Sequence, residues 1–129
     1  MTTPHFAFTK LVVADLDKSA AFYEAIFGLK PQSRIDATLS GRAISEIIYE
    51  PTAKGGGTFI LLTFHDTPLP AQGEIIVGFF TADVDDLTAR IMAAGGAILQ
   101  APHDAPEHGL RIAIAADPEG HVIEIVNPL

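Results

Sequence analysis

Leu11-Val12-Val13-Ala14-Asp15-Leu16-Asp17 is followed by a helical stretch that ends at Gly28, and the same plan returns later in the chain. The second copy, Phe79-Phe80-Thr81-Ala82-Asp83-Val84-Asp85, is followed by a helical stretch that ends at Gly95-Gly96. An offset of 68 residues separates Asp15 from Asp83. Each copy is a hydrophobic strand, an Asp-rich turn and a helix closed by glycine. Such a repeat predicts one domain of two similar halves, with a cleft where the halves curl together.

Composition limits the classes of protein that the chain can belong to. The 129 residues are enough for one domain with a real core, and a hydrophobic content of 48% indicates a folded chain. The net charge of −8 argues against nucleic acid and is compatible either with a cationic ligand or with solubility alone. No apolar run approaches the roughly 18 residues of a membrane span, and the segment 1–5 does not resemble a signal peptide.

The absence of cysteine excludes disulfides, thiolate catalysis and cysteine-ligated metal. A cytoplasmic location is the default expectation for such a chain.

The periodicity predicts the element order βαβββ twice, and so an α+β fold. In the first half we expect Asp17 to cap a helix over 18–27 that ends at Gly28, and in the second half Asp83 to cap a helix that runs to about Ala94. Segment 66–73 reads as the linker, with module one at about 5–66 and module two at about 73–129. Segment 102–108, which contains two prolines, reads as a polar loop. The expected strands are 6–13, 30–35, 43–49, 58–64, 74–82, 97–100, 110–116 and 121–127.

Several motifs at these separations resemble the vicinal oxygen chelate superfamily of glyoxalases, bleomycin-resistance proteins and extradiol dioxygenases. They are the pattern Val13-Ala14-Asp15-Leu16-Asp17 with Phe22-Tyr23, then Phe27-Gly28-Leu29, and the run from Asp117 to Glu124. The resemblance covers nearly the whole chain. It implies two βαβββ modules that form curved mixed sheets around a cleft, often in a homodimer. In the enzymes of this group, the cleft holds a divalent metal on four strand positions.

The resemblance places those four metal positions at Phe8, Leu61, Ile76 and Glu124. Three of them are apolar, and one carboxylate cannot hold a divalent cation at neutral pH. A shift of one residue at Leu61 changes nothing, because Ile60 and Leu62 are apolar as well. We therefore expect no metal and no other cofactor, and a pocket lined by these four residues.

Glu124 shares a strand face with Val122 and Val126, opposite Ile123 and Ile125. It is either a base or cation-binding group in an apolar pocket, or a structural carboxylate satisfied internally. Lys10, on the same strand face as Phe8, is a possible neutralising partner for it.

Other polar residues are weaker candidates for the site. His65, at a strand end, and His108, beside the predicted loop, are possible rim residues of the pocket, although a solvated strand end or loop explains each of them too. His121 is expected to point outward.

Two classes of function stay open. The first is a metal-independent protein that binds a small organic molecule. The second is a glyoxalase-like lyase or isomerase that acts on a small carbonyl or thioester compound, with Glu124 as base. An extradiol dioxygenase is disfavoured, because its iron needs two histidines and a carboxylate. The curved sheets leave edges and an apolar face to cover, so a homodimer is expected, with no nucleic acid or membrane partner.

Overall fold

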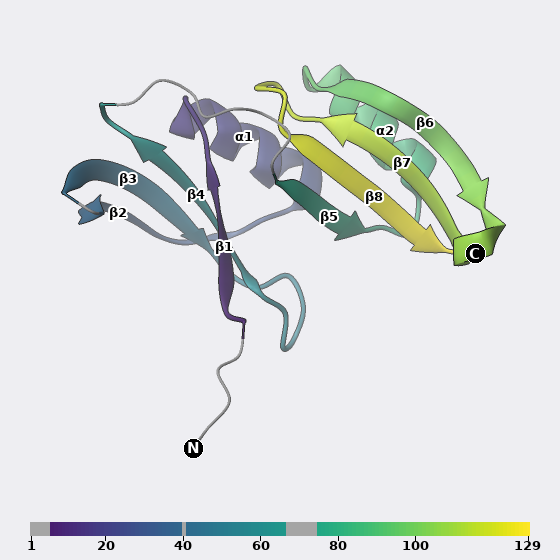
Figure 1. The fold of residues 1–129 in the computed structure, drawn as a ribbon, viewed down its shortest axis with the longest axis horizontal. Helices are drawn as coiled ribbons and strands as arrows, with labels where there is room; N and C mark the ends of the chain where they lie inside the picture. Colours follow the sequence, from purple (N-terminus) through teal and green to yellow (C-terminus); the bar gives the residue numbers. More distant parts are fainter. Residues whose placement is uncertain (1–5, 40, 67–74) are drawn as a thin grey trace. The chain divides into compact units, whose positions relative to one another are not determined.

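The computed structural model describes residues 6–39, 41–66 and 75–129. The chain divides into two compact units, Met1–Pro70 and Ala71–Leu129. Each unit is a βαβββ module with a four-stranded mixed sheet and one long helix (Figure 1), which confirms the predicted fold class. Most of the predicted linker lies outside the described residues.

The first module places its first two strands in sequence at opposite edges of the sheet. Its elements are β1 (Phe8–Val12), α1 (Leu16–Phe27), β2 (Pro31–Leu39), β3 (Arg42–Tyr49) and β4 (Thr58–Phe64). The strand order is β1-β4-β3-β2, with β1 parallel to β4 and the other pairs antiparallel. Helix α1 packs on β3 and β4. Strand β2 is therefore an edge strand, and all nine of its residues are exposed.

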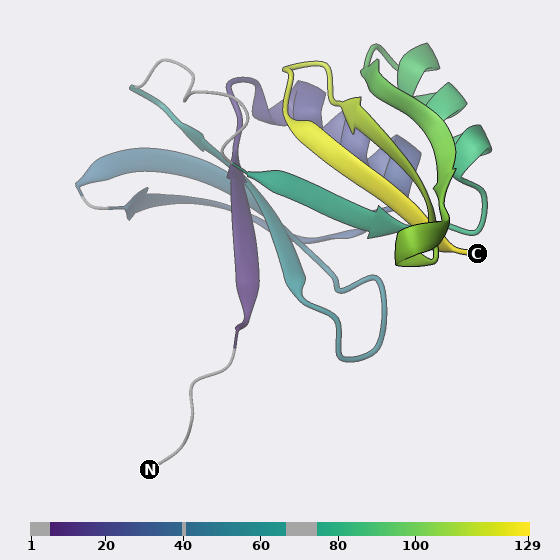
Figure 2. The same ribbon diagram turned by 45° about the vertical axis from the view of Figure 1, so that its right-hand side comes forward.

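The second module repeats this plan (Figure 2). Its elements are β5 (Ile76–Phe80), α2 (Val84–Ala93), β6 (Ala97–Ala105), a short 3₁₀ turn η1 (Pro106–His108), β7 (Leu110–Ala116) and β8 (Val122–Pro128). The strand order is β5-β8-β7-β6, with β5 parallel to β8. Helix α2 packs on β6, β7 and β8. The two sheets thus have the same topology, each with one helix on one face.

The helix caps confirm one sequence prediction and correct the other. Asp83 caps α2 as predicted, its Oδ1 accepting a hydrogen bond from the N–H of Asp86 at 3.0 Å. In the first module the cap is Asp15, not Asp17, and its Oδ1 accepts from the N–H of Lys18 at 3.0 Å. Asp17 lies inside the first turn of α1, where a negative charge favours the positive end of the helix dipole.

Two strands are longer than the sequence predicted. Strand β2 runs on to Leu39, and β6 runs to Ala105 through most of the segment predicted to be a loop. Pro102 is tolerated in β6 because this is an edge strand, whose pairing with β7 is irregular on both sides of Gln100. Proline has no backbone N–H, so in a central strand it would remove a hydrogen bond of the sheet. An edge strand has positions where that hydrogen bond is not needed.

Much of the core of each module lies between the sheet and its helix, and in the first module Ile60 and Leu62 are also buried, on the other face of the sheet. In the first module the buried ring of Tyr23 contacts the rings of Phe27 and Phe59. In the second, fully buried Ile91 of α2 faces a sheet that presents fully buried Ile123 and Ile125. These side chains leave water completely, which is the main favourable term in folding.

We predict that Gly96→Ala destabilises the protein. A Cβ at Gly96 would lie 2.5 Å from the carbonyl oxygen of Ala116 and 2.6 Å from Cγ2 of Ile91, so the end of α2 would have to move off the sheet. Such overpacking costs about 1–3 kcal/mol of unfolding free energy, measurable by urea denaturation.

Gly78→Ala is the matched control, because a Cβ there meets its nearest heavy atom at 4.0 Å. Equal stability of the two variants would contradict the close approach at Gly96.

Candidate functional site

Each sheet has a second face, opposite its own helix, which we call the open face of that module. Strand pairing defines it, because directly paired residues point to the same side of a sheet. In the first module Leu11 pairs with Leu61, and both are buried on the helix side. Lys10 pairs with Ile60, so these two side chains and Phe8 belong to the open face.

Leu61 is therefore not on the same face as Phe8, and the register that we assigned to β4 was wrong by one residue. The equivalent pairs in the two modules are Lys10 with Ile60 and Gly78 with Glu124. The counterpart of Glu124 is thus Ile60. This correction does not change the conclusion about metal binding, because neither Ile60 nor Leu61 has a side-chain atom that can bind a metal ion.

Glu124 lies on the open face of the second module, as strand alternation indicated. It pairs with Gly78 on one side and Ile114 on the other, while Ile123 and Ile125 point toward α2. The side chain of Glu124 is half-buried, and within the part of the chain that the structure describes its carboxylate has no hydrogen-bond or ion-pair partner.

The surroundings of this carboxylate are apolar. Ile76 and Phe80 are exposed on the same face, with relative exposures of 58% and 78%. Gly78 leaves open space beside Glu124, since a Cβ added to this glycine would meet no heavy atom closer than 4.0 Å. The open face thus combines one carboxylate with no partner among the described residues, apolar neighbours on β5, β7 and β8, and a gap where a side chain is missing. Gln100 and His103 of β6 share this face.

Lys10 has a different partner from the one expected. Its Nζ donates a hydrogen bond to Oε2 of Glu46 at 2.9 Å and lies 5.7 Å from the ring centroid of Phe8. Glu46 is only 5% exposed. Glu46 and Tyr49 lie on opposite faces of β3, because an odd number of residues separates them. Charge on the open face of the first module is therefore neutralised within that module.

The candidate histidines do not lie on the open face of their own module. His65 follows β4 on the side of Leu61, and Ser45 bridges it to Asp36. His108 is exposed in the turn η1 between β6 and β7. Among the described residues of the second module, His108 has no hydrogen bond or ion pair with Glu124.

His121 was expected to point outward, and this was wrong. It is 7% exposed, and its Nδ1 lies 2.8 Å from Oδ2 of Asp117. Asp117 also accepts backbone hydrogen bonds from Glu119 and His121. The pair closes the turn before β8 and so fixes the start of the strand that carries Glu124.

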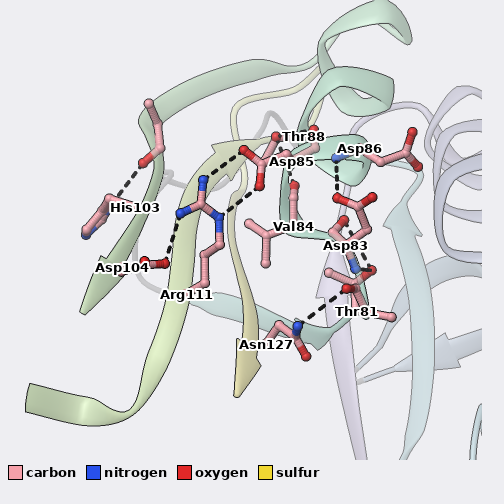
Figure 3. Close-up of polar contacts among 12 residues, drawn as sticks. Thr81, Asp83, Val84, Asp85, Asp86, Thr88, His103, Asp104, Arg111 and Asn127 are labelled. Carbon is pink, nitrogen blue, oxygen red and sulfur yellow. Dashed lines mark hydrogen bonds and ion pairs between the residues drawn. The ribbon is translucent and has the colours of Figure 1, made fainter. Parts of the chain in front are cut away.

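A second set of charges fixes the start of α2 (Figure 3). Arg111 of β7 donates two hydrogen bonds to the carboxylate of Asp85, at 2.8 and 2.9 Å, and a third to Asp104 of β6 at 2.9 Å. These contacts hold the pKa of the Asp85 carboxyl below its usual range and raise the pKa of the arginine. The arrangement joins helix and sheet on the side away from Glu124.

In the first module, a buried hydroxyl plays a similar structural role. Burial and a 2.9 Å hydrogen bond to Glu24 raise the pKa of the Tyr49 hydroxyl, which therefore stays protonated and donates. Strand β3 and helix α1 are joined by this contact.

The residues at the four metal positions do not fit a divalent cation. With the corrected register they are Phe8, Ile60, Ile76 and Glu124, and only the last has a ligand atom. No group of three histidine, cysteine or acidic residues placed to hold a metal ion occurs in the described ranges. The same ranges contain no helix long and apolar enough to cross a membrane.

Comparison with known proteins agrees with this architecture. The family model of the Glyoxalase/Bleomycin resistance protein/Dioxygenase superfamily matches residues 3–125, so the chain belongs to this superfamily. It is 35% identical to an uncharacterized protein of Mycolicibacterium smegmatis over 92% of this chain and 90% of that one. It is also 28% identical to a "Probable lactoylglutathione lyase" of Vibrio cholerae serotype O1, over 98% of this chain and 92% of that one.

A glyoxalase family protein of Bacillus cereus has the same fold, with a TM-score of 0.84. The two structures align over 100% of this chain and 97% of that one, with 20% sequence identity.

We predict that Lys10→Met destabilises the protein by about 1–3 kcal/mol, because the change leaves the buried Glu46 carboxylate without its partner. The double variant Lys10→Met/Glu46→Leu should recover most of this loss, since an apolar pair needs no charge compensation. A double-mutant cycle in urea denaturation measures the coupling. If the double variant is less stable than Lys10→Met alone, the ion pair is not the reason for the loss.

Proposed function

We propose that this protein binds a small organic molecule on the open face of the second module, without a metal ion. Glu124 is the observation that carries the proposal: a half-buried carboxylate with no described partner, on an apolar surface beside the gap at Gly78. A charge in such a place is costly unless it is compensated. A ligand with an apolar body and a cationic group fits both features.

Ile76, on the same face of the second module as Glu124, is proposed to contribute apolar contact to the ligand. The roles of Phe8 and Lys10 in ligand binding stay predictions from the sequence. Leu61 is excluded from this role because it is buried on the helix side of its sheet. His65 and His108 stay predictions from the sequence, because no hydrogen bond among the described residues links either of them to a ligand site.

The binding site is tested with a matched pair of ligands, phenethylamine and 2-phenylethanol, which share an apolar body and differ in charge. We expect the amine to bind more tightly to the wild-type protein, by about 1 kcal/mol or roughly fivefold. In Glu124→Gln this preference should disappear while the fold is retained. Chemical-shift titration of the open-face methyl groups measures both affinities.

Gly78→Val is the steric counterpart, because its side chain would fill the space beside Glu124. It should weaken both ligands alike. Unchanged affinity in Gly78→Val, or a preference for the amine that survives in Glu124→Gln, would place binding elsewhere. Elemental analysis of the untagged protein should find far less than one zinc, nickel, iron or manganese ion per chain.

The alternative is a glyoxalase-like lyase or isomerase with Glu124 as the base. Its support is the name of the Vibrio cholerae relative and the placement of Glu124 on the open face. An assay for lactoylglutathione lyase activity, with and without added divalent metal, separates the two proposals. Activity that requires Glu124 would favour the enzyme.

We also propose a homodimer, with the cytoplasmic location expected from the sequence. Its support is the edge strand β2, which exposes nine consecutive residues, among them Ile35 and Leu39 at 40% each. A long exposed edge of this kind is normally covered. Light scattering at micromolar concentration should give twice the chain mass of 13.7 kDa. A mass equal to one chain would contradict the dimer.

A further inference from the structure

Three polar side chains lie in a row across β2, β3 and the end of β4. Asp36 pairs with Ser45, Ser45 pairs with Thr63, and His65 lies two residues further on the same side. The Oγ of Ser45 lies 2.5 Å from Oδ1 of Asp36 and 2.7 Å from Nε2 of His65. This row is on the helix side of the sheet and so is separate from the open face.

Proton counting sets the direction of these hydrogen bonds. An ionised carboxylate can only accept, so the single hydroxyl proton of Ser45 goes to Asp36. Ser45 must then accept from His65, which places the ring proton on Nε2. This direction is opposite to that of a serine nucleophile, whose hydroxyl donates to histidine. The hydroxyl oxygen of Ser45 is therefore not the nucleophile.

The reactive atom in this arrangement is Nδ1 of His65. With Nε2 protonated, the neutral ring carries its lone pair on Nδ1. The histidine is exposed, and within the described residues no hydrogen bond occupies Nδ1. Ser45 and Asp36 thus fix both the tautomer and the orientation of the ring, and they leave its nucleophilic nitrogen open to solvent.

We propose that His65 is an acceptor site for small acyl donors such as activated esters, with Ser45 and Asp36 as positioning residues. Nδ1 forms a bond to the carbonyl carbon, and the ester C–O bond breaks as the alkoxide or phenolate leaves with the electron pair. The ring becomes cationic in this step, and the Asp36 carboxylate stabilises it through the Ser45 hydroxyl. Water then cleaves the N–C bond: its hydroxyl group joins the acyl carbon to give the carboxylic acid, and its remaining proton passes to the departed alkoxide or phenolate, which restores the neutral ring.

His103 provides a comparison within the same molecule (Figure 3). Its Nδ1 lies 2.9 Å from the carbonyl oxygen of Ala101, so Nδ1 donates and Nε2 carries the lone pair. Like His65, it is an exposed histidine with one ring proton fixed by a hydrogen bond. Only His65 has a carboxylate behind its hydrogen-bond partner. A difference in reactivity between the two residues therefore reports the contribution of Asp36.

The test is carbethoxylation by a small amount of diethyl pyrocarbonate at neutral pH, followed over time by peptide mass spectrometry. We expect His65 to react about tenfold faster than His103 in the wild-type protein, the scale of one charge-assisted hydrogen bond. Ser45→Ala and Asp36→Asn should each bring the rate at His65 down to that at His103. Glu124→Gln should leave the rate at His65 unchanged, which separates this site from the proposed binding face.

Two results would overturn the proposal. One is equal rates at His65 and His103 in the wild-type protein, a comparison that requires no variant to fold. The other is an unchanged rate at His65 in Ser45→Ala. Nitrogen-15 NMR of the rings gives an independent readout: the Nε2–H tautomer of His65 should dominate in the wild-type protein and become mixed in Ser45→Ala.

Discussion

Each sheet of this protein has a helix on only one face, and strand alternation then decides where every other side chain goes. In the second module Ile123 and Ile125 must point toward α2, because no other element of that module covers them. Glu124 is therefore forced onto the opposite face. The same rule puts Lys10 on the open face of the first module once Leu11 is fixed in its core. The chemistry that we assign to the open faces depends on this constraint.

The fold was predictable because its signals repeat. A strand, an Asp-rich turn and a glycine-closed helix occur twice, and the second cap, Asp83, was identified correctly. The first cap was misassigned to Asp17, although the 68-residue offset itself points from Asp83 to Asp15. The length of β6 was missed because Pro102 was taken as the end of a strand, whereas an edge strand tolerates it.

The candidate site was less predictable, because its contacts join residues that are distant in sequence. The ion pair of Lys10 with Glu46 and the bridge from Asp36 through Ser45 to His65 depend on strand register. A one-residue shift would move each side chain of the strand to the opposite face of the sheet. Consecutive apolar residues such as Ile60, Leu61 and Leu62 give no pattern from which to choose the register. The alternation around Glu124 was clear enough to place it.

The two modules share a scaffold but differ at equivalent positions. The first has Lys10 beside Ile60, and the second has Gly78 beside Glu124. In the first module, Glu46 neutralises the charge of Lys10 in an ion pair. In the second, the glycine removes the position from which a compensating side chain would come, and the carboxylate has no partner among the described residues. Because the two sheets have the same topology, this difference in charge compensation, rather than any difference in fold, makes the second module the stronger candidate for ligand binding.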